Sequence, residues 1–167
     1  MPEIKTRIDL SGLKETEEKL RKLEKAFKSR DLLEAIREDL LRSHQDRFER
    51  QMAPDGTPWA PLNPLYAQSK GGQGILRKSG RLSNLASAIQ DKSIVIGTNV
   101  KYAAIHQFGG VIKPRPGRRA LRFQIDGKWF IRSKVVIPAR PFLGVSEEDK
   151  KGVQETIQDY IEECMGD

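Results

Sequence analysis

The dipeptide Asp126-Gly127 constrains the fold more than any other feature, because a strand-like stretch lies on each side of it. Asp-Gly favours the two-residue turn of a β-hairpin, whose twist matches that of the strands it joins. Residues 119–125 and 128–137 are therefore predicted to pair as antiparallel strands.

A second hairpin is indicated on either side of Asp91-Lys92, between residues 86–90 and 93–97. Short apolar stretches separated by a tight turn are typical of paired strands. The assignment is open at its start, since residues 81–88 could equally begin as a helical turn. Apolar and polar residues also alternate over residues 3–10, which predicts a first strand.

Helical periodicity marks both ends of the chain. Ser11 is a good N-cap for a first helix, in which Leu20 and Phe27 share an apolar face. Asp31 with Glu34 starts a second helix, and Gly109-Gly110 ends a short one. The predicted helices cover residues 11–28, 31–52, 100–108 and 153–164.

These elements predict an α+β fold for residues 1–167, a single domain with an antiparallel sheet packed against amphipathic N-terminal and C-terminal helices. Four prolines and many glycines fill residues 53–80, yet Trp59 and several leucines there need a core to bury in, so we expect an ordered loop. Residues 70–74 are its expected mobile tip. We also expect residues 66–75 and 111–119 to become ordered only on assembly.

Charge is segregated along the sequence. Residues 101–140 hold ten Lys or Arg against one acid, Asp126, whereas residues 141–167 hold eight acids against two lysines. Such a distribution could bind nucleic acid, or let copies of the chain meet head to tail. The exposed candidates for a basic patch are Lys113, Arg115, Arg118 and Arg119. Trp129 and Phe130 nearby could stack on bases or could equally be core residues.

Catalytic and metal-binding constellations are missing from the pattern. His44 follows the apolar stripe of its helix, and His106 has no cysteine or second histidine nearby. Cys164 lies beside two glutamates, which would raise the pKa of a thiol rather than lower it. We therefore expect no enzyme activity and no cofactor or metal. The N-terminus lacks a secretory pattern and no stretch could span a membrane, which predicts a soluble product.

Three stretches together resemble the phage virion morphogenesis family, which includes the Mu-like tail completion proteins. They are residues 54–62 (PDGTPWAPL), residues 97–110 (GTNVKYAAIHQFGG) and residues 137–144 (IPARPFLG), with ILRKSGRL between the first two. The resemblance runs from about Phe48 to Ser146. The N-terminal residues 1–28 are the more variable part.

This resemblance implies a non-enzymatic assembly protein of a bacteriophage or prophage, acting in tail completion or head-tail joining. It implies contacts with other tail or neck proteins and a homo-oligomeric ring, a hexamer by analogy. The protein would be made in the host cytoplasm and end in the virion, without membrane contact. The alternative is an accessory protein that binds DNA weakly and non-specifically at the portal or neck through residues 101–140.

The motifs also give candidate site residues. The expected structural anchors are Trp59, Leu62, Tyr102, His106, Phe108 and Gly109. The expected subunit interface is Arg140, Pro141 and Phe142, because Pro138 and Pro141 restrict the backbone and Arg and aromatic side chains are enriched at interfaces. Two internal alternatives stay open: Arg140 could pair with a carboxylate of its own chain, and Phe142 could pack in its own core.

Overall fold

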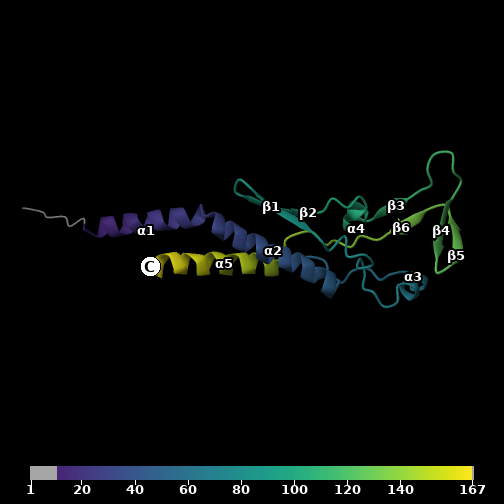
Figure 1. Cartoon of the computed structure of the whole chain (residues 1–167), viewed down its shortest axis with the longest axis horizontal. Coiled ribbons are helices and arrows are strands. Elements are labelled where there is room, and N and C mark those ends of the chain that lie inside the picture. The colour runs from purple at the N-terminus through teal and green to yellow at the C-terminus, as the bar shows by residue number, and fades with distance from the viewer. Residues whose placement is uncertain (1–10, 167) are drawn as a thin grey trace, which may run out of the picture.

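The computed structural model describes residues 11–166, which form an elongated molecule with long helices at one end and most strands at the other (Figure 1). The long helices are α1 (Ser11–Phe27), α2 (Arg30–Arg50) and α5 (Glu147–Gly166). Helix α5 runs alongside both α1 and α2. Separate helices and antiparallel strands confirm the α+β class. The strand expected over residues 3–10 lies outside the described residues.

Helix α2 begins one residue earlier than the Asp31 start that the sequence suggested. Its N-cap is Ser29, whose side chain accepts a hydrogen bond from the backbone N of Asp31 at 3.1 Å. The C-cap of the helix is Gln51, the residue after Arg50, and it adopts a left-handed conformation with φ of 55°. Its buried face includes Ile36 and Phe48, so α2 supplies one wall of the core.

Helix α1 differs from the expectation that its apolar stripe is buried. Leu20 and Phe27 are 60% and 56% exposed, whereas Ala26 is buried. The reason is that α1 extends along α5 beyond the strands, so only part of its surface has a neighbour. The hydroxyl of Tyr160 on α5 donates to Ser29 Oγ at 2.8 Å, close to the junction of α1 and α2.

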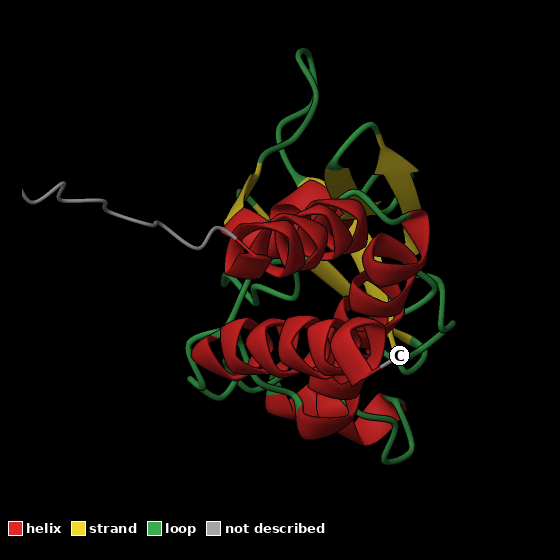
Figure 2. Ribbon diagram, turned by 90° about the vertical axis from the view of Figure 1, so that its left-hand side faces the viewer, coloured by secondary structure: helices red, strands yellow, loops and turns green. Residues whose placement is uncertain are grey.

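The strands form three separate two-stranded antiparallel sheets rather than the one sheet expected. Seen from the helical end, they lie behind the helices (Figure 2). Both predicted hairpins are present, but the predicted strand 128–137 is divided at residues 133–134, and its second half pairs elsewhere. The pairs are β1 (Ala86–Gln90) with β2 (Ser93–Gly97), β4 (Leu121–Ile125) with β5 (Lys128–Arg132), and β3 (Gly110–Ile112) with β6 (Val135–Ile137).

The connection from α2 to β1 contains a short helix that the sequence did not suggest, α3 (Pro64–Ser69). Asn63 caps it by accepting a hydrogen bond from the backbone N of Leu65 at 3.1 Å, and Pro64 is its first residue. The predicted short helix before Gly109 is α4 (Ala103–Phe108).

The core lies where α2, the long connection and the segment before α5 meet. Its buried members are Phe48, Trp59, Leu82, Leu85 and Phe142. The ring of Phe48 lies 5.5 Å from that of Trp59 and 5.3 Å from that of Phe142, centroid to centroid. Aromatic rings at these separations attract one another beyond their buried area.

Candidate functional site

The three motif stretches that the sequence singled out meet at one short segment, residues 140–143. The indole Nε1 of Trp59 donates to the carbonyl of Pro141 at 2.7 Å. From the second stretch, Gln107 Oε1 accepts from the backbone N of both Phe142 and Leu143 at 3.0 Å, and its Nε2 donates to the carbonyl of Leu143 at 2.8 Å. One glutamine side chain thus pairs with this segment as a neighbouring strand would.

Arg140 joins the same three stretches. Its side chain is 5% exposed, and it donates from Nε to the carbonyl of Ala60 at 2.7 Å and from Nη2 to that of Pro61 at 2.9 Å. Its backbone N donates to the carbonyl of His106 at 2.6 Å. The guanidinium therefore holds residues 54–62 against residues 140–143, because it donates to two backbone carbonyls that are not hydrogen-bonded in any β-strand pairing.

These contacts correct the interface predicted for Arg140 and Phe142, whereas Pro141 is only half-buried. The Phe142 side chain is 0% exposed and belongs to the core, so its ring presents no surface to another subunit. Arg140 is buried against backbone carbonyls, not the carboxylate considered as its alternative partner. Gln107 was missed, because nothing in its local sequence shows that an amide faces a segment more than thirty residues away.

A buried ion pair holds α5 to α2. Arg47 donates to Asp149, whose side chain is fully buried, and also to the carbonyl of Gly144 at 2.6 Å. Asp149 in turn accepts from the backbone N of Ser146 at 2.7 Å and from the hydroxyl of Ser43, while Ser146 Oγ accepts from the backbone N of Asp149 at 3.0 Å. The reciprocal bonds of Ser146 and Asp149 form a capping box, and the three-residue spacing of this serine and carboxylate marks the start of α5 in the sequence.

Burial favours the neutral form of Asp149, but its partners outweigh that effect. The hydrogen bonds from Ser146, the hydroxyl of Ser43 and the charge of Arg47 bring the pKa of Asp149 below its ordinary value. His44, one turn from Arg47, is buried and donates from Nδ1 to the carbonyl of Leu40 at 2.6 Å. Burial lowers the pKa of His44, so it is a neutral structural residue near neutral pH.

The remaining anchor candidates divide into buried and exposed ones. Gly109 has φ of 72°, and a Cβ there would lie 2.8 Å from the backbone N of Ala139, so glycine is required. Leu62 is half-buried. Tyr102 is 43% exposed and makes an edge contact with the His106 ring at 6.0 Å, and Phe108 is 79% exposed. The sequence suggested Phe108 as a structural anchor, but its side chain is not buried and cannot hold α4 in that way.

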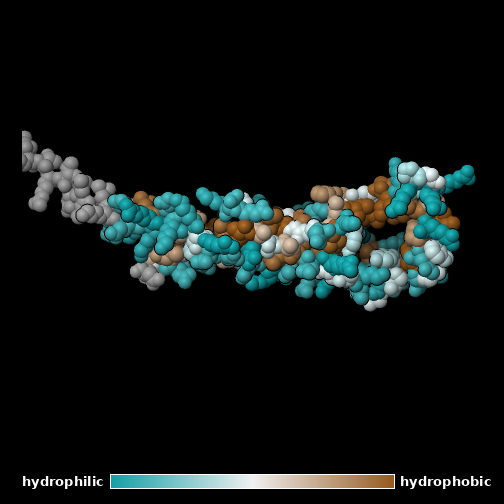
Figure 3. Space-filling model, turned by 45° about the horizontal axis from the view of Figure 1, so that its top comes forward, coloured by the Kyte–Doolittle hydropathy of each residue, from teal (hydrophilic) through white to brown (hydrophobic). Residues whose placement is uncertain are grey.

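Phe108 belongs instead to an exposed apolar surface on the strand-rich end. Val111 and Val136 lie directly opposite each other across β3 and β6, and they are 50% and 63% exposed. We call Phe108, Val111 and Val136 the apolar face. Figure 3 shows hydrophobic residues gathered over this half of the molecule. Exposed apolar surface of this kind can mark a site of protein contact.

A groove of about 910 Å³ lies between α3 and the inner side of the β4–β5 hairpin. Phe123 and Phe130 stack across the hairpin at 5.9 Å and line it. Of the described residues that line the groove, five are Lys or Arg and none is Asp or Glu. These cations are Lys70, Lys78, Arg132, Lys134 and Arg140.

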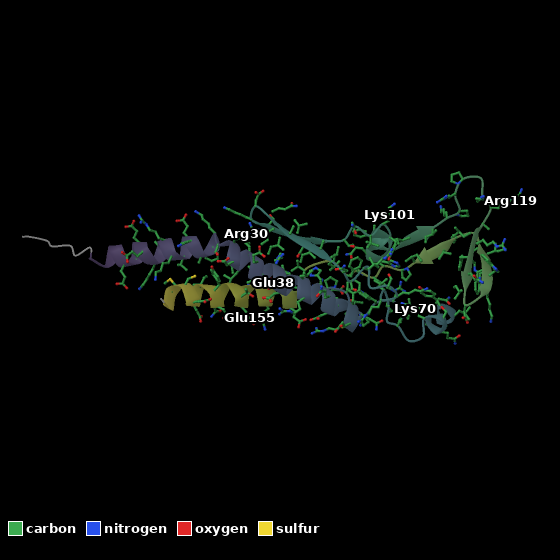
Figure 4. All side chains as sticks on the ribbon, in the orientation of Figure 1. Arg30, Glu38, Lys70, Lys101, Arg119 and Glu155 are labelled. Carbon is green, nitrogen blue, oxygen red and sulfur yellow. The ribbon has the colours of Figure 1, made fainter. Side chains whose placement is uncertain are left out.

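The predicted basic patch is placed on the connection between β3 and β4. Lys113, Arg115, Arg118 and Arg119 are all exposed, and none has an ion pair within residues 11–166. Figure 4 shows Arg119 at the far end of the strand-rich half. Next to it, the Arg122 guanidinium stacks over the Trp129 ring at 4.5 Å.

The part of the chain that the structure describes offers little support for metal binding or for insertion in a membrane. No group of three or more His, Cys, Asp or Glu side chains there could hold a metal ion. Cys164 is a free, half-buried thiol. Among residues 11–166, no helix combines the length and the apolar character needed to cross a membrane.

Comparison with known proteins identifies the family. The chain is 35% identical over 101 residues to the Mu-like prophage FluMu G protein 2 of Haemophilus influenzae, a match covering 59% of this chain and 61% of that protein. It is 32% identical over 131 residues to Tail completion protein S of Escherichia phage P2, covering 74% of this chain and 77% of that protein. No solved structure matches. The profile of the phage virion morphogenesis family matches residues 8–162, and the chain therefore belongs to that family.

Proposed function

We propose that this protein is a non-catalytic component of phage assembly that completes the tail or joins it to the head, working as a closed ring of identical copies. Membership of the virion morphogenesis family supports an assembly role. The relative from phage P2 is named for tail completion, which favours that step. The protein would act in the host cytoplasm and remain in the virion.

One observation carries the proposal: the family's motif stretches build the core but leave an apolar face exposed beside it. In a single copy, Phe108, which is 79% exposed, and the exposed Val111 and Val136 gain little from burial. An assembly protein does gain, because burying such residues against a neighbour stabilises the contact by roughly 25 cal/mol per Å² of apolar area. The apolar face is therefore the surface that meets another tail or neck protein.

A pair of valines gives a matched test. Val136→Asp places a charge in the apolar face, and Val95→Asp places one on β2, where the valine is also an exposed strand residue. Complementation of a phage lacking the gene, with heads, tails and complete particles counted by electron microscopy, should show complete particles reduced at least about tenfold for Val136→Asp. Val95→Asp should complete particles normally.

The purified variants should unfold within a few degrees of the wild type, since both positions are exposed. Normal particle yield from a folded Val136→Asp protein would refute the assignment of the apolar face. An equal loss from both variants would show that any added charge disturbs assembly, and would refute it as well.

Exposure of the four cations of the β3–β4 connection favours a second candidate function, non-specific DNA contact at the portal or neck. Neutralising four phosphates should give a slope of about −3.6 for log affinity against log salt. Replacing Arg118 and Arg119 by Gln should reduce that slope by about half. Affinity for duplex DNA that does not depend on salt would exclude this candidate.

A further inference from the structure

The groove beside α3 buries positive charge without a counter-charge. Lys70 is 7% exposed and Arg140 is 5% exposed, although Lys and Arg are seldom buried unless they are paired. Within residues 11–166 neither makes an ion pair, and neither do Lys78 or Lys134 at the rim. Isolated charges in such a position are costly, so the groove is electrostatically incomplete in a single copy.

Unused hydrogen-bond donors point the same way. Lys70 Nζ makes one hydrogen bond, to the carbonyl of Gly74 at 2.7 Å, and lies 5.9 Å from the Tyr66 ring centroid, which leaves two of its N–H groups without an acceptor among the described residues. His106 also lines the groove, and its buried Nδ1 has no hydrogen-bond partner among the described residues. Burial and the neighbouring Lys78 and Arg140 lower the pKa of Lys70, as expected for a cation lacking an anion.

An unmatched acidic surface lies on α5 of the same chain. The acids of its first turn are all paired: Glu147 with Lys150, Glu148 with Arg50 and Asp149 with Arg47. Farther along, within the described residues, Glu155, Asp159, Glu162 and Glu163 are exposed and have no cation partner.

Glu155, Asp159 and Glu163 follow one another at a spacing of four residues, which places their like charges on one face of the helix. We call this surface the acidic face. Neighbouring carboxylates at this spacing destabilise a helix slightly, and cations from a partner would relieve their repulsion.

The acidic face and the groove are too far apart to meet within one copy. Figure 4 shows Glu155 on α5 in the helical half, and Lys70 toward the opposite end of the long axis. Contact between them requires two copies, each offering a different surface to the other. A contact of this heterologous kind closes into a ring when the rotation between copies divides a full turn.

We infer that the groove of each copy binds the acidic face of α5 from the next copy, with carboxylates seated on Lys70 and the rim lysines Lys78 and Lys134. The inference rests on the oligomer proposed above and identifies the two surfaces that form it. Phe123 and Phe130 provide the dry walls that strengthen these charge contacts. Val136 of the apolar face also lines the groove, whereas Phe108 and Val111 do not, so these two side chains stay free for a different tail or neck protein.

Variants that remove the charges of the groove rim or of the acidic face test this contact without disturbing the core. The rim variant is Lys78→Gln with Lys134→Gln, and the helix variant is Glu155→Gln with Asp159→Asn and Glu163→Gln; all five side chains are exposed. A matched control, Lys92→Gln with Lys101→Gln, removes the same charge as the rim variant from exposed sites outside the groove. Each protein is examined by analytical ultracentrifugation and native mass spectrometry at low and high salt.

The wild type and the control should form the same discrete oligomer, which dissociates with added salt. Each variant alone should weaken association at least about tenfold and remain monomeric where the wild type assembles. A mixture of the two variants should form heterodimers and stop there, because each pair retains a single intact contact between one groove and one acidic face.

The outcomes separate this inference from the proposed function. Wild-type oligomers that survive either variant would overturn the assignment of these surfaces and leave the ring intact. Loss of oligomers in the rim variant but not in the helix variant would show that the groove takes another acidic segment, which overturns the role of α5. A wild type that stays monomeric at every concentration and salt level would overturn the ring and the inference together.

Discussion

The side chain of Phe142 is fully buried, and its truncation should have a large effect on stability. Phe142→Ala removes a ring that packs 5.3 Å from Phe48 at the centre of the core. Changes from Phe to Ala in a core cost roughly 3–5 kcal/mol, a large part of the roughly 5–15 kcal/mol that stabilises a domain. For a chain of this length each kcal/mol lowers Tm by about 2–4 °C, so we expect a loss of about 6–20 °C.

Phe108 provides the control, because it is the same residue type at the opposite extreme of exposure. Phe108→Ala should change stability by less than about 0.5 kcal/mol and leave Tm within about 2 °C of the wild type. Thermal unfolding followed by circular dichroism, with urea titration as a second measure, gives both values. Equal Tm changes in the two variants, or a Phe142→Ala protein as stable as the wild type, would refute this description of the core.

Three further predictions concern the charged and strained positions. Asp149→Asn leaves Arg47 buried without its counter-charge and should lower the free energy of unfolding by roughly 3–5 kcal/mol in urea titration. Burial lowers the pKa of both His44 and His106 below the ordinary 6.5, so the unfolded chain binds their protons more readily. The free energy of unfolding should therefore fall as the pH drops from about 7 to about 5, and replacing both by Gln should flatten that dependence. Gly109→Ala should cost roughly 1–3 kcal/mol in backbone strain alone, visible as a lower Tm.

Local signals in the sequence were sufficient for most of the secondary structure. Asp126 and Gly127 both adopt positive φ, at 49° and 75°, as the predicted hairpin turn requires. The helices around Phe48 and Tyr160 follow apolar periodicity. Helix α3 escaped notice because its six residues are too few to show a periodic face, and only Asn63-Pro64 indicates its start.

Long-range placement could not be obtained in the same way. Arg140 stands between Pro138 and Pro141, and Phe142 follows Pro141; that pattern suits an interface as well as a core. The partners that decide between them, Ala60 and Gln107, lie far away along the chain. For the same reason the sequence does not indicate the groove: Lys70 and Arg140 lie 70 residues apart along the chain, and only folding brings them to one surface.

The dependence of the core on residues 140–143 also sets an order of events during synthesis. Phe48 and Trp59 leave the ribosome early, but the carbonyl that receives the Trp59 indole follows 82 residues later. At about 5–20 residues per second, these aromatic rings wait roughly 4–16 s before their partners exist. The nascent chain therefore carries an unfinished hydrophobic centre while 82 of its 167 residues are being made. Chaperones that bind exposed aromatic segments would therefore bind this chain until residues 140–143 have been made and have joined the core.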